Sequence, residues 1–361
     1  MLQLQDLQTP ALLIRLDRVR ANVARMLEIL DGDPTRWRPH VKTSKVPEVL
    51  DLLLDAGVRH FKCATTREAA VLLSRAWQPI DLLVAMTLHG ANRQRLAALA
   101  DDHAEHRVSM LTEDAEHATQ TRAVAPALGL FVDLDPGYHR TGIALDHRPR
   151  IAATLEACAE RFRGLHFYDG HLHDGAPEER TARTTPIYRQ LVELADAVGV
   201  GDRELITSGT PTFPMALRHP DFAGRDHKVS PGTVVYWDAR SEALSIPGFS
   251  PAAFVLSRVV SAPAADRVTC DAGSKALDAA AGDPCARVVD WPGLRALTPS
   301  EEHLPLLATD GGPVPPLGAL LQLVPRHVCP TVNLADDAVL LDGESIVAVV
   351  PVAARGHETL A

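Results

Sequence analysis

The chain of 361 residues lacks the features that mark nucleic-acid-binding, membrane and secreted proteins. It has no basic tract and a formal net charge of −10, so nucleic acid is not an expected partner. No apolar run is long enough to cross a bilayer. The N-terminal stretch MLQLQDLQTP has neither the charged start nor the apolar core of a signal peptide. We therefore expect no membrane association and no secretion signal.

Cysteine is also scarce, and its pattern excludes a disulfide framework. The five cysteines are odd in number and scattered along the chain: Cys63, Cys158, Cys270, Cys285 and Cys329. Such a pattern predicts a reducing, cytoplasmic location. Hydrophobic residues make up 46% of the chain and charged residues 23%, which is typical of a folded globular protein.

From residue 11 onward, short β-type runs alternate with longer helical patterns. The expected strands are residues 11–17, 37–43, 60–66, 81–87, 107–112, 128–135, 165–171 and 204–210. Alternation of this kind is typical of βαβ units, and eight such units predict a (β/α)8 barrel. Many of these runs end in polar residues, which is where such a barrel carries its active site.

After about residue 240 the pattern changes to short β-type runs separated by Gly, Pro and Asp, without long helical segments. This pattern of short strands and turns predicts a separate all-β domain. We therefore expect a barrel over residues 11–240 and a β domain over residues 241–361 together with residues 1–10.

The segment RPHVKTSK, residues 38–45, places cationic side chains at the end of an expected barrel strand. A partly desolvated lysine beside other cations has a lowered pKa and becomes a nucleophile. Lys42, with Arg38, His40 and Lys45 near it, is therefore a candidate to bind pyridoxal phosphate. The alternative is an ordinary strand-end lysine that points to water.

Two loops with glycine and hydroxyl residues are candidates to bind a phosphate group. SGTPT, residues 208–212, follows an expected strand, and SPGT, residues 230–233, is the second loop. Backbone N–H groups and hydroxyls in such loops can hold phosphate without many cations. Ordinary turns have the same composition, so each loop alone leaves both interpretations open.

Two further motifs contain candidate functional residues. In VDLDPGYHRTGI, residues 132–143, Arg140 follows a turn and could meet the phenolic oxygen of pyridoxal phosphate, or it could be a solvated loop residue. In PRHVCPTVNL, residues 325–334, His327 and Cys329 would face the same side of a strand. Imidazole and thiolate suit zinc, although two ligands make an incomplete site and such a pair is often structural.

Taken in order, these motifs resemble the D-threonine aldolase / D-serine dehydratase group of fold-type III pyridoxal-phosphate enzymes, which have an alanine-racemase-like architecture. The resemblance covers about residues 6–356. The motifs that carry it are PHVKTSK, HRTG, SGTPT, PGTVVYWD, DAGSKAL, SEEH and PRHVCPTVNL.

The resemblance implies a cofactor-binding (β/α)8 barrel followed by a C-terminal all-β domain. It also implies a homodimer in which the barrel of one subunit meets the β domain of the other at each active site. Lys42 would bind the cofactor covalently, Arg140 would meet its phenolic oxygen, and Tyr168 would neighbour its pyridine nitrogen. The other cofactor-binding residues implied are His40, Ser208, Gly209, Thr210, Gly232 and Thr233. His327 and Cys329 would bind a divalent metal and act with Lys42 in catalysis.

The implied activity is that of a lyase for D-β-hydroxy amino acids, either a D-serine or D-threonine dehydratase or a D-threonine aldolase. The Cys329 thiolate favours zinc and resembles the dehydratases, whereas aldolases of the group more often resemble His-x-Asp and use manganese. Ser44 stands where many members of the group have histidine. His171 and His173 would add side chains that can carry positive charge near the cofactor ring. The alternatives are therefore a 3-hydroxy-D-aspartate aldolase or dehydratase, and an alanine-racemase-type racemase.

Overall fold

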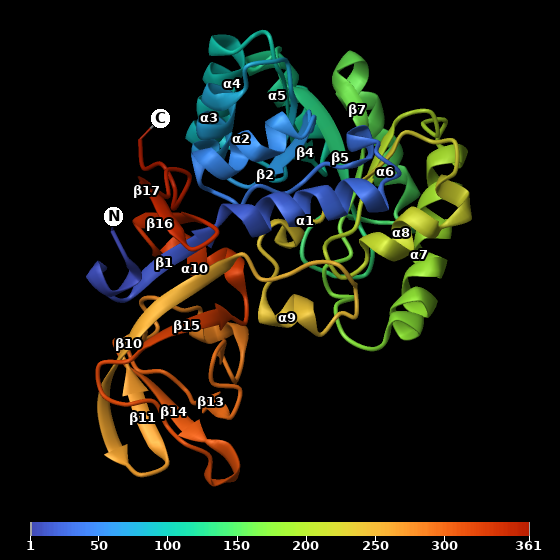
Figure 1. Ribbon diagram of the computed structural model, residues 1–361. Coiled ribbons are helices and arrows are strands. Elements are labelled where there is room, and N and C mark those ends of the chain that lie inside the picture. The colour runs from blue at the N-terminus through green and yellow to red at the C-terminus, as the bar shows by residue number, and fades with distance from the viewer. Residues whose placement is uncertain (1, 361) are drawn as a thin grey trace. The chain divides into compact units, whose positions relative to one another are not determined.

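The computed structural model describes residues 2–360, except for the side chain of Asp310, and the chain forms two compact units (Figure 1). The barrel unit comprises Leu27–Lys42, Leu53–Gly232 and Gly356–Ala361. The β unit comprises Met1–Met26, Thr43–Leu52 and Thr233–Arg355. No helix among the described residues is both long enough and apolar enough to cross a membrane.

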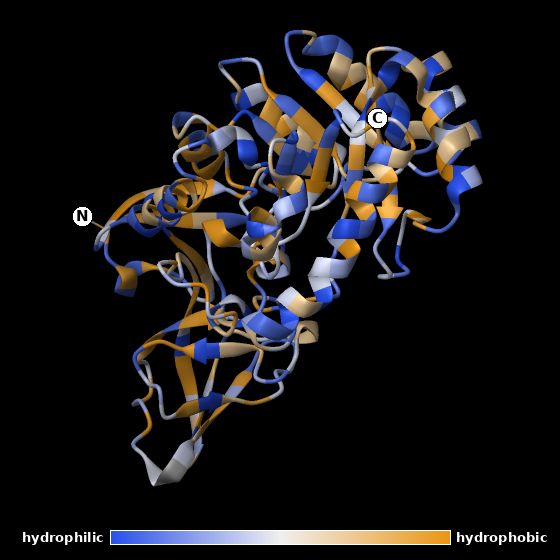
Figure 2. Cartoon of the chain, turned by 90° about the vertical axis from the view of Figure 1, so that its right-hand side faces the viewer, coloured by the Kyte–Doolittle hydropathy of each residue, from blue (hydrophilic) through white to orange (hydrophobic). Residues whose placement is uncertain are grey.

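The barrel unit is built on parallel strands that follow one another in sheet order. They are β2 (His60–Cys63), β3 (Asp81–Val84), β4 (Arg107–Thr112), β5 (Gly129–Asp135), β7 (Phe162–Phe167), β8 (Glu204–Thr207) and β9 (His227–Val229), with the short β6 (Ile143–Ala144) paired to β5. Parallel bridges from Trp37 to Val229 and from His40 to Lys62 place residues 37–40 between β9 and β2. Eight parallel segments thus close a TIM-like barrel. Its strands are largely hydrophobic (Figure 2), as expected for strands covered on both faces.

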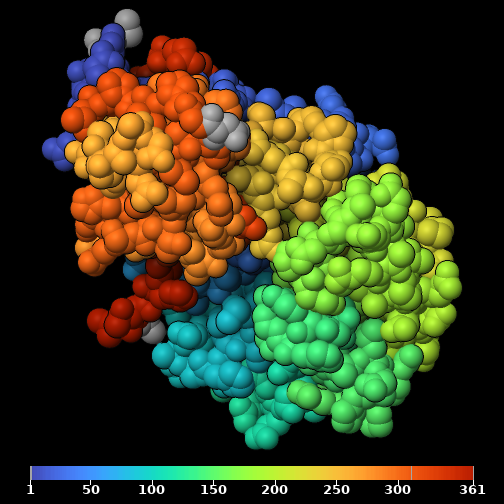
Figure 3. Space-filling view, turned by 90° about the horizontal axis from the view of Figure 1, so that it is seen from below, coloured from blue at the N-terminus to red at the C-terminus, as the bar shows by residue number. Residues whose placement is uncertain are grey.

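Helices alternate with these strands and cover the outside of the barrel. They are α3 (Thr66–Arg75), α4 (Gly90–Asp102), α5 (Ala115–Val124), α6 (Arg148–Cys158), α7 (Pro177–Ala197) and α8 (Phe213–Arg218), with the 3-10 turns η2 (Pro34–Arg36), η3 (Ala159–Arg161) and η4 (Pro220–Phe222). The Thr65 and Asp114 side chains cap α3 and α5 by accepting hydrogen bonds from backbone N–H groups of the first turn. In the space-filling view of Figure 3, the part of the chain that contains α7 is yellow-green and lies on the surface.

The β unit contains a nine-stranded sheet in the order β11-β14-β13-β12-β15-β10-β1-β16-β17. Its strands are β1 (Ala11–Arg15), β10 (Ala253–Ala264), β11 (Arg267–Cys270), β12 (Ala286–Val288), β13 (Leu294–Ala296), β14 (Leu304–Ala308), β15 (Leu320–Pro325), β16 (Asp337–Asp342) and β17 (Ser345–Pro351). Pairing of β10 with β11 closes six of these strands into an antiparallel barrel. Val268, Leu304 and Leu323 are fully buried in its interior.

The remaining helical elements of the chain are short, except for α1. They are α1 (Leu16–Ile29), α2 (Pro47–Asp55), α9 (Ala239–Glu242) and α10 (Val328–Leu334), with the 3-10 turns η1 (Leu4–Asp6), η5 (Thr233–Val235), η6 (Ala279–Ala281) and η7 (Thr309–Gly311). Of these, α9 and α10 carry residues that bear on the candidate site.

The predicted fold class is confirmed, but the assignment of one strand is wrong. Residues 11–17 were expected in the parallel barrel, whereas β1 pairs antiparallel with β10 and parallel with β16. The barrel closes instead with β9, which the sequence analysis did not identify as a strand. At three residues, β9 is too short to give a hydrophobic periodicity. The proposed domain division at residue 240 stays a prediction.

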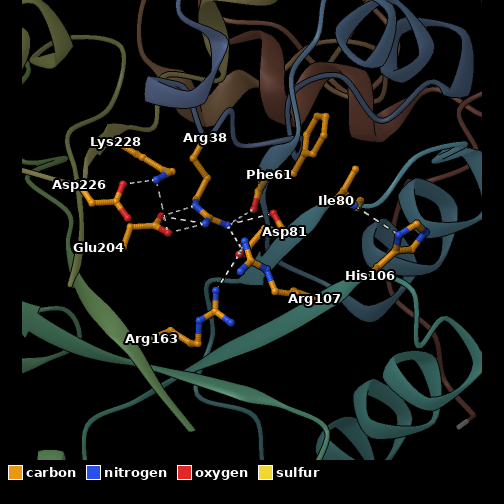
Figure 4. A network of polar contacts seen from close by, with 10 residues as sticks. All are labelled: Arg38, Phe61, Ile80, Asp81, His106, Arg107, Arg163, Glu204, Asp226 and Lys228. Carbon is orange, nitrogen blue, oxygen red and sulfur yellow. Dashed lines mark hydrogen bonds and ion pairs between the residues drawn. The ribbon is translucent and has the colours of Figure 1, made fainter. Parts of the chain in front are cut away.

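Arg38 closes the opposite end of the barrel from the polar strand ends (Figure 4). Its guanidinium is fully buried and pairs with Glu204 at 2.8 Å and with Asp81 at 3.0 Å, at the first residues of β8 and β3. Arg107 and Arg163 also pair with Asp81. The guanidinium of Arg38, expected near Lys42, is held instead by carboxylates at the first residues of β3 and β8.

Candidate active site

Lys42 lines a cavity inside the barrel unit. The cavity has a volume of about 360 Å³, and its lining includes His40, Lys42, Lys62, Asp133, Arg140 and Tyr168. Lys42 is half-buried, and its backbone N–H points to Nδ1 of His40 at 3.4 Å. The structure thus brings together four residues that the sequence analysis selected, His40, Lys42, Arg140 and Tyr168, from distant parts of the chain.

Lys45, in contrast, lies outside the barrel unit. It belongs to the β unit, where it is buried and its Nζ donates a hydrogen bond to the backbone carbonyl of Ala354 at 3.3 Å. A role of Lys45 beside Lys42 stays a prediction.

The second amine in the cavity belongs to Lys62, which the sequence analysis missed. Its Nζ lies 3.3 Å from Nε2 of His166, and Nδ1 of His166 lies 2.7 Å from Asp133. Burial, followed by the charge of Lys42, lowers the pKa of Lys62 from 10.5 to about 7. The signal was available in HFKC, where a lysine interrupts an apolar strand. Such a lysine must be partnered or functional.

Tyr168 connects the cavity to the SGTPT loop. The Arg140 guanidinium lies 5.1 Å from the centre of its ring, and Lys62 Nζ lies 5.3 Å from it. A Cβ added at Gly209 would lie 3.1 Å from the Tyr168 ring. The phenol therefore packs against the loop backbone on one side and lines the cavity on the other. A flat ligand anchored at Lys42 could extend over Tyr168 to this loop.

The SGTPT and SPGT loops hold buried hydroxyls that have no protein partner. Within the described residues, Oγ of Ser208, Oγ1 of Thr210 and Oγ of Ser230 are buried without a hydrogen bond. Ser208 also adopts a φ of 61°, in the left-handed region that ordinary residues avoid. A buried hydroxyl without a hydrogen-bond partner destabilises the folded protein unless a bound ligand provides that partner. Gly232, buried at the end of the second loop, belongs to the same unit.

This combination fits pyridoxal phosphate. Lys42 supplies the amine, Tyr168 a flat surface and Arg140 a cation at one edge. The free hydroxyls of Ser208 and Thr210 suit a phosphate group. Such a group is held by oriented N–H and O–H donors at a loop of this kind.

In the β unit, His327 is held by a carboxylate that the sequence analysis did not select. Its Nδ1 lies 3.2 Å from Oδ2 of Asp238, which also accepts a hydrogen bond from the backbone N–H of Val328 at 3.0 Å. The other oxygen of Asp238 caps α9 through Ser241. A carboxylate at one nitrogen of a histidine orients the other nitrogen toward a metal. Asp238 lies in the motif PGTVVYWD.

Cys329 completes the pair with His327, and two hydroxyls approach its sulfur. Sγ lies 3.0 Å from Oγ1 of Thr43 and 3.7 Å from Oγ1 of Thr233. Burial alone would lower the pKa of His327, but hydrogen bonds with Asp238 and Cys329 raise it to about 10. The same negative groups that hold a proton on the imidazole would favour a cation, so the donor set fits a soft divalent metal.

The expectation that His327 and Cys329 lie on a strand is wrong. His327 is the N-cap residue of α10, and Cys329 lies in the first turn of that helix. The two side chains still interact, because a helix start folds back on itself within one turn. Thr233, assigned to the phosphate by the resemblance, contacts Cys329 and belongs to the β unit.

His171 and His173 follow β7 in the barrel unit. The His171 ring stacks on Tyr138 with ring centres 5.2 Å apart, and burial lowers the pKa of this histidine. His173 is half-buried, and its Nδ1 lies 3.2 Å from the carbonyl of His171. A contact of His171 or His173 with a substrate side chain stays a prediction.

The comparisons with known proteins agree with this arrangement. The family model "Alanine racemase, N-terminal domain" matches residues 14–239, and the model "Putative serine dehydratase domain" matches residues 252–341. Since the first match covers more than half of the chain, the chain belongs to the alanine racemase N-terminal domain family. The resemblance stated from the motifs is thereby confirmed.

Relatives that align along the whole chain are enzymes with related names. A D-threonine aldolase of Arthrobacter sp. is 28% identical, with 98% of this chain and 94% of that protein covered. The D-threo-3-hydroxyaspartate dehydratase of Delftia sp. is 26% identical, with 91% and 92% covered. The crystal structure of D-threonine aldolase from Filomicrobium marinum superimposes with a TM-score of 0.84 at 27% identity, covering 98% and 97% of the two chains.

Proposed function

We propose that this chain is a pyridoxal-phosphate- and divalent-metal-dependent lyase that acts on D-β-hydroxy amino acids. Its activity would be either D-serine or D-threonine dehydration or D-threonine aldol cleavage. The observation that carries the proposal is the cavity of the barrel unit, which Lys42 lines together with Arg140 and Tyr168.

Each cofactor-binding residue has a distinct task in this proposal. Lys42 would attach covalently to the cofactor, with His40 beside it, and Tyr168 would neighbour the pyridine nitrogen. Arg140 lies close enough to the Tyr168 ring to meet the phenolic edge of a bound cofactor. Ser208, Gly209 and Thr210, with Gly232 from the second loop, hold the phosphate. The free hydroxyls described above support this assignment.

The chemistry divides between the cofactor and the chain. Pyridoxal phosphate supplies an electron sink for Cα of an amino acid. The Lys42 amine is the base that takes or returns the α-proton in the dehydratase reaction. In the aldolase reaction a base takes the β-hydroxyl proton instead, and Cα–Cβ breaks. The outcome depends on which proton the chain's bases can reach.

His327 and Cys329 would hold the metal, with Asp238 orienting the imidazole. A divalent cation there would supply Lewis acidity to a β-hydroxyl. The thiolate favours zinc over manganese, which supports the dehydratase as the first activity to test. A 3-hydroxy-D-aspartate aldolase or dehydratase is the second candidate, supported by relatives with those names at 25–26% identity over more than 90% of the chain.

We also infer a homodimer as the working form and the cytoplasm as its location. The dimer is supported by the resemblance alone. The cytoplasm is supported by the five cysteines of the described chain, which are buried and form no disulfide.

The test is product analysis with purified protein, pyridoxal phosphate and either zinc or manganese. D-threonine, D-serine and D-threo-3-hydroxyaspartate are the substrates, and L-threonine is the control. A 2-oxo acid with ammonia identifies a dehydratase, and glycine with an aldehyde identifies an aldolase. Conversion of D-serine into L-serine without either product would identify a racemase and overturn the proposal.

A further inference from the structure

We propose that Asp169, acting through Thr212, is a positioning residue that holds the SGTPT loop in its phosphate-binding conformation. The inference deepens the proposed function, since it rests on the assignment of this loop to the cofactor phosphate. Asp169 directly follows Tyr168, so one strand end contacts the loop at two points. Tyr168 packs against Gly209, and Asp169 binds the side chain of Thr212.

The hydrogen bonds around Thr212 have a fixed direction. Its hydroxyl donates to Oδ1 of Asp169 at 2.8 Å, since a carboxylate can only accept. Its oxygen is then free to accept the N–H of Gly209 at 3.3 Å. Thr212 thus ties the centre of the loop to the strand that carries Tyr168. Asp169 determines which partner Thr212 donates to.

Asp169 itself is immobilised. Its side chain is completely buried, and Oδ2 accepts a hydrogen bond from the Tyr188 hydroxyl of α7 at 2.5 Å. Tyr188 is also completely buried. Both carboxylate oxygens are therefore occupied by hydroxyl donors from elements on either side. The carboxylate cannot turn toward another partner without leaving one of these donors unsatisfied.

The hydrogen bonds of Asp169, Thr212 and Tyr188 account for the unusual conformation of the SGTPT loop. Ser208 has the left-handed φ of 61°, and the hydroxyls of Ser208 and Thr210 lack partners. A conformation of this kind persists only where the surroundings impose it. The Thr212–Gly209 bond, together with the Gly209 carbonyl bonds to the N–H groups of Thr212 and Phe213, imposes it here. The free hydroxyls then remain available to a phosphate.

The experiment compares the affinities of the cofactor-free protein for pyridoxal phosphate and for pyridoxal, which lacks the phosphate. The ratio of the two dissociation constants measures what the loop contributes, while Lys42 contributes to both ligands. In Thr212→Val we expect the preference for pyridoxal phosphate to fall by about tenfold or more, with pyridoxal binding nearly unchanged. Thr212→Ser keeps the hydroxyl and should stay within about threefold of the wild type.

Asp169→Asn and Tyr188→Phe complete the comparison. Both should lower the preference, because the amide no longer fixes the Thr212 hydroxyl and the phenylalanine frees the carboxylate. Tyr188→Phe also tests the inference if Thr212→Val does not fold. A folded Thr212→Val or Tyr188→Phe protein with the wild-type ratio would overturn the inference. Tighter cofactor binding in Asp169→Asn would also overturn it, because Asp169 would then act only by repelling the phosphate through its negative charge.

The wild type separates this inference from the proposed function. A wild-type protein that binds pyridoxal as tightly as pyridoxal phosphate would refute the phosphate assignment on which both depend. A wild type that prefers the phosphate, with variants that retain that preference, would refute the role of Asp169 and Thr212 alone.

Discussion

Oδ2 of Asp238 lies 3.2 Å from Nδ1 of His327, which leaves Nε2 of the imidazole for another partner. The same oxygen accepts the N–H of Val328, so the carboxylate fixes both the histidine ring and the start of α10. Cys329 follows in the first turn of that helix. One buried carboxylate thus sets the geometry of both residues proposed to bind the metal.

Asp238→Asn should therefore weaken zinc binding by about 10- to 100-fold without loss of pyridoxal phosphate. The amide still fits the space, but it no longer fixes the tautomer and orientation of His327. The measurement is competition for zinc with a chelator of known affinity, together with the absorbance of the bound cofactor. Cys329→Ala is the comparison variant, because it removes a proposed metal ligand. It should lose the metal and keep the cofactor. Unchanged zinc affinity in Asp238→Asn would remove Asp238 from the site.

Lys42→Ala should abolish covalent attachment of pyridoxal phosphate. Reduction with borohydride followed by peptide mass spectrometry should label the Lys42 peptide in the wild type and no lysine in the variant. Lys62→Met is the control, because it removes the other cavity amine and should keep the label on Lys42. If the Lys62 peptide were labelled instead, equally in the wild type and in Lys42→Ala, Lys62 would be the attachment site.

The sequence allowed the barrel and the β domain to be predicted, and its local motifs led to Lys42, Arg140 and Tyr168, which line one cavity. The contributions of Lys62, Asp169 and Asp238 escaped prediction, since each depends on partners that only the fold brings close. Asp169, for example, binds Tyr188 and Thr212, which lie 19 and 43 residues away. The partners of Arg38 escaped prediction for the same reason, because they lie at the starts of β3 and β8.

Lys62 should give the stability of the cofactor-free protein a specific dependence on pH. Its pKa is about 7 in the folded protein and close to 10.5 in the unfolded chain. Below pH 7 both states are protonated, and the folded state carries the full cost of the buried charge. Between these values only the unfolded chain keeps the proton, so the stability contributed at this site rises with pH.

Lys62→Met should accordingly stabilise the protein most below pH 7. Its advantage over the wild type should shrink by roughly 2–3 kcal/mol between pH 6 and pH 9. Urea unfolding of both proteins at the two pH values measures the difference. Lys275→Met, at an exposed lysine, provides the control with a pH-independent difference. A constant difference for Lys62→Met would mean that Lys62 does not titrate in this range.

The Arg38 network should matter for stability and not for the site. Arg38→Met leaves Asp81 and Glu204 as buried carboxylates without their central partner, which should lower the free energy of unfolding by about 3–5 kcal/mol. Arg107→Met removes a partner of the same Asp81, but that arginine side chain is 60% exposed. Its loss should cost less than about 1 kcal/mol, because water already screens the pair. Urea unfolding measures both changes. The ratio of pyridoxal phosphate to pyridoxal affinity in folded Arg38→Met should equal that of the wild type, and an altered ratio would show that the network reaches the cofactor site.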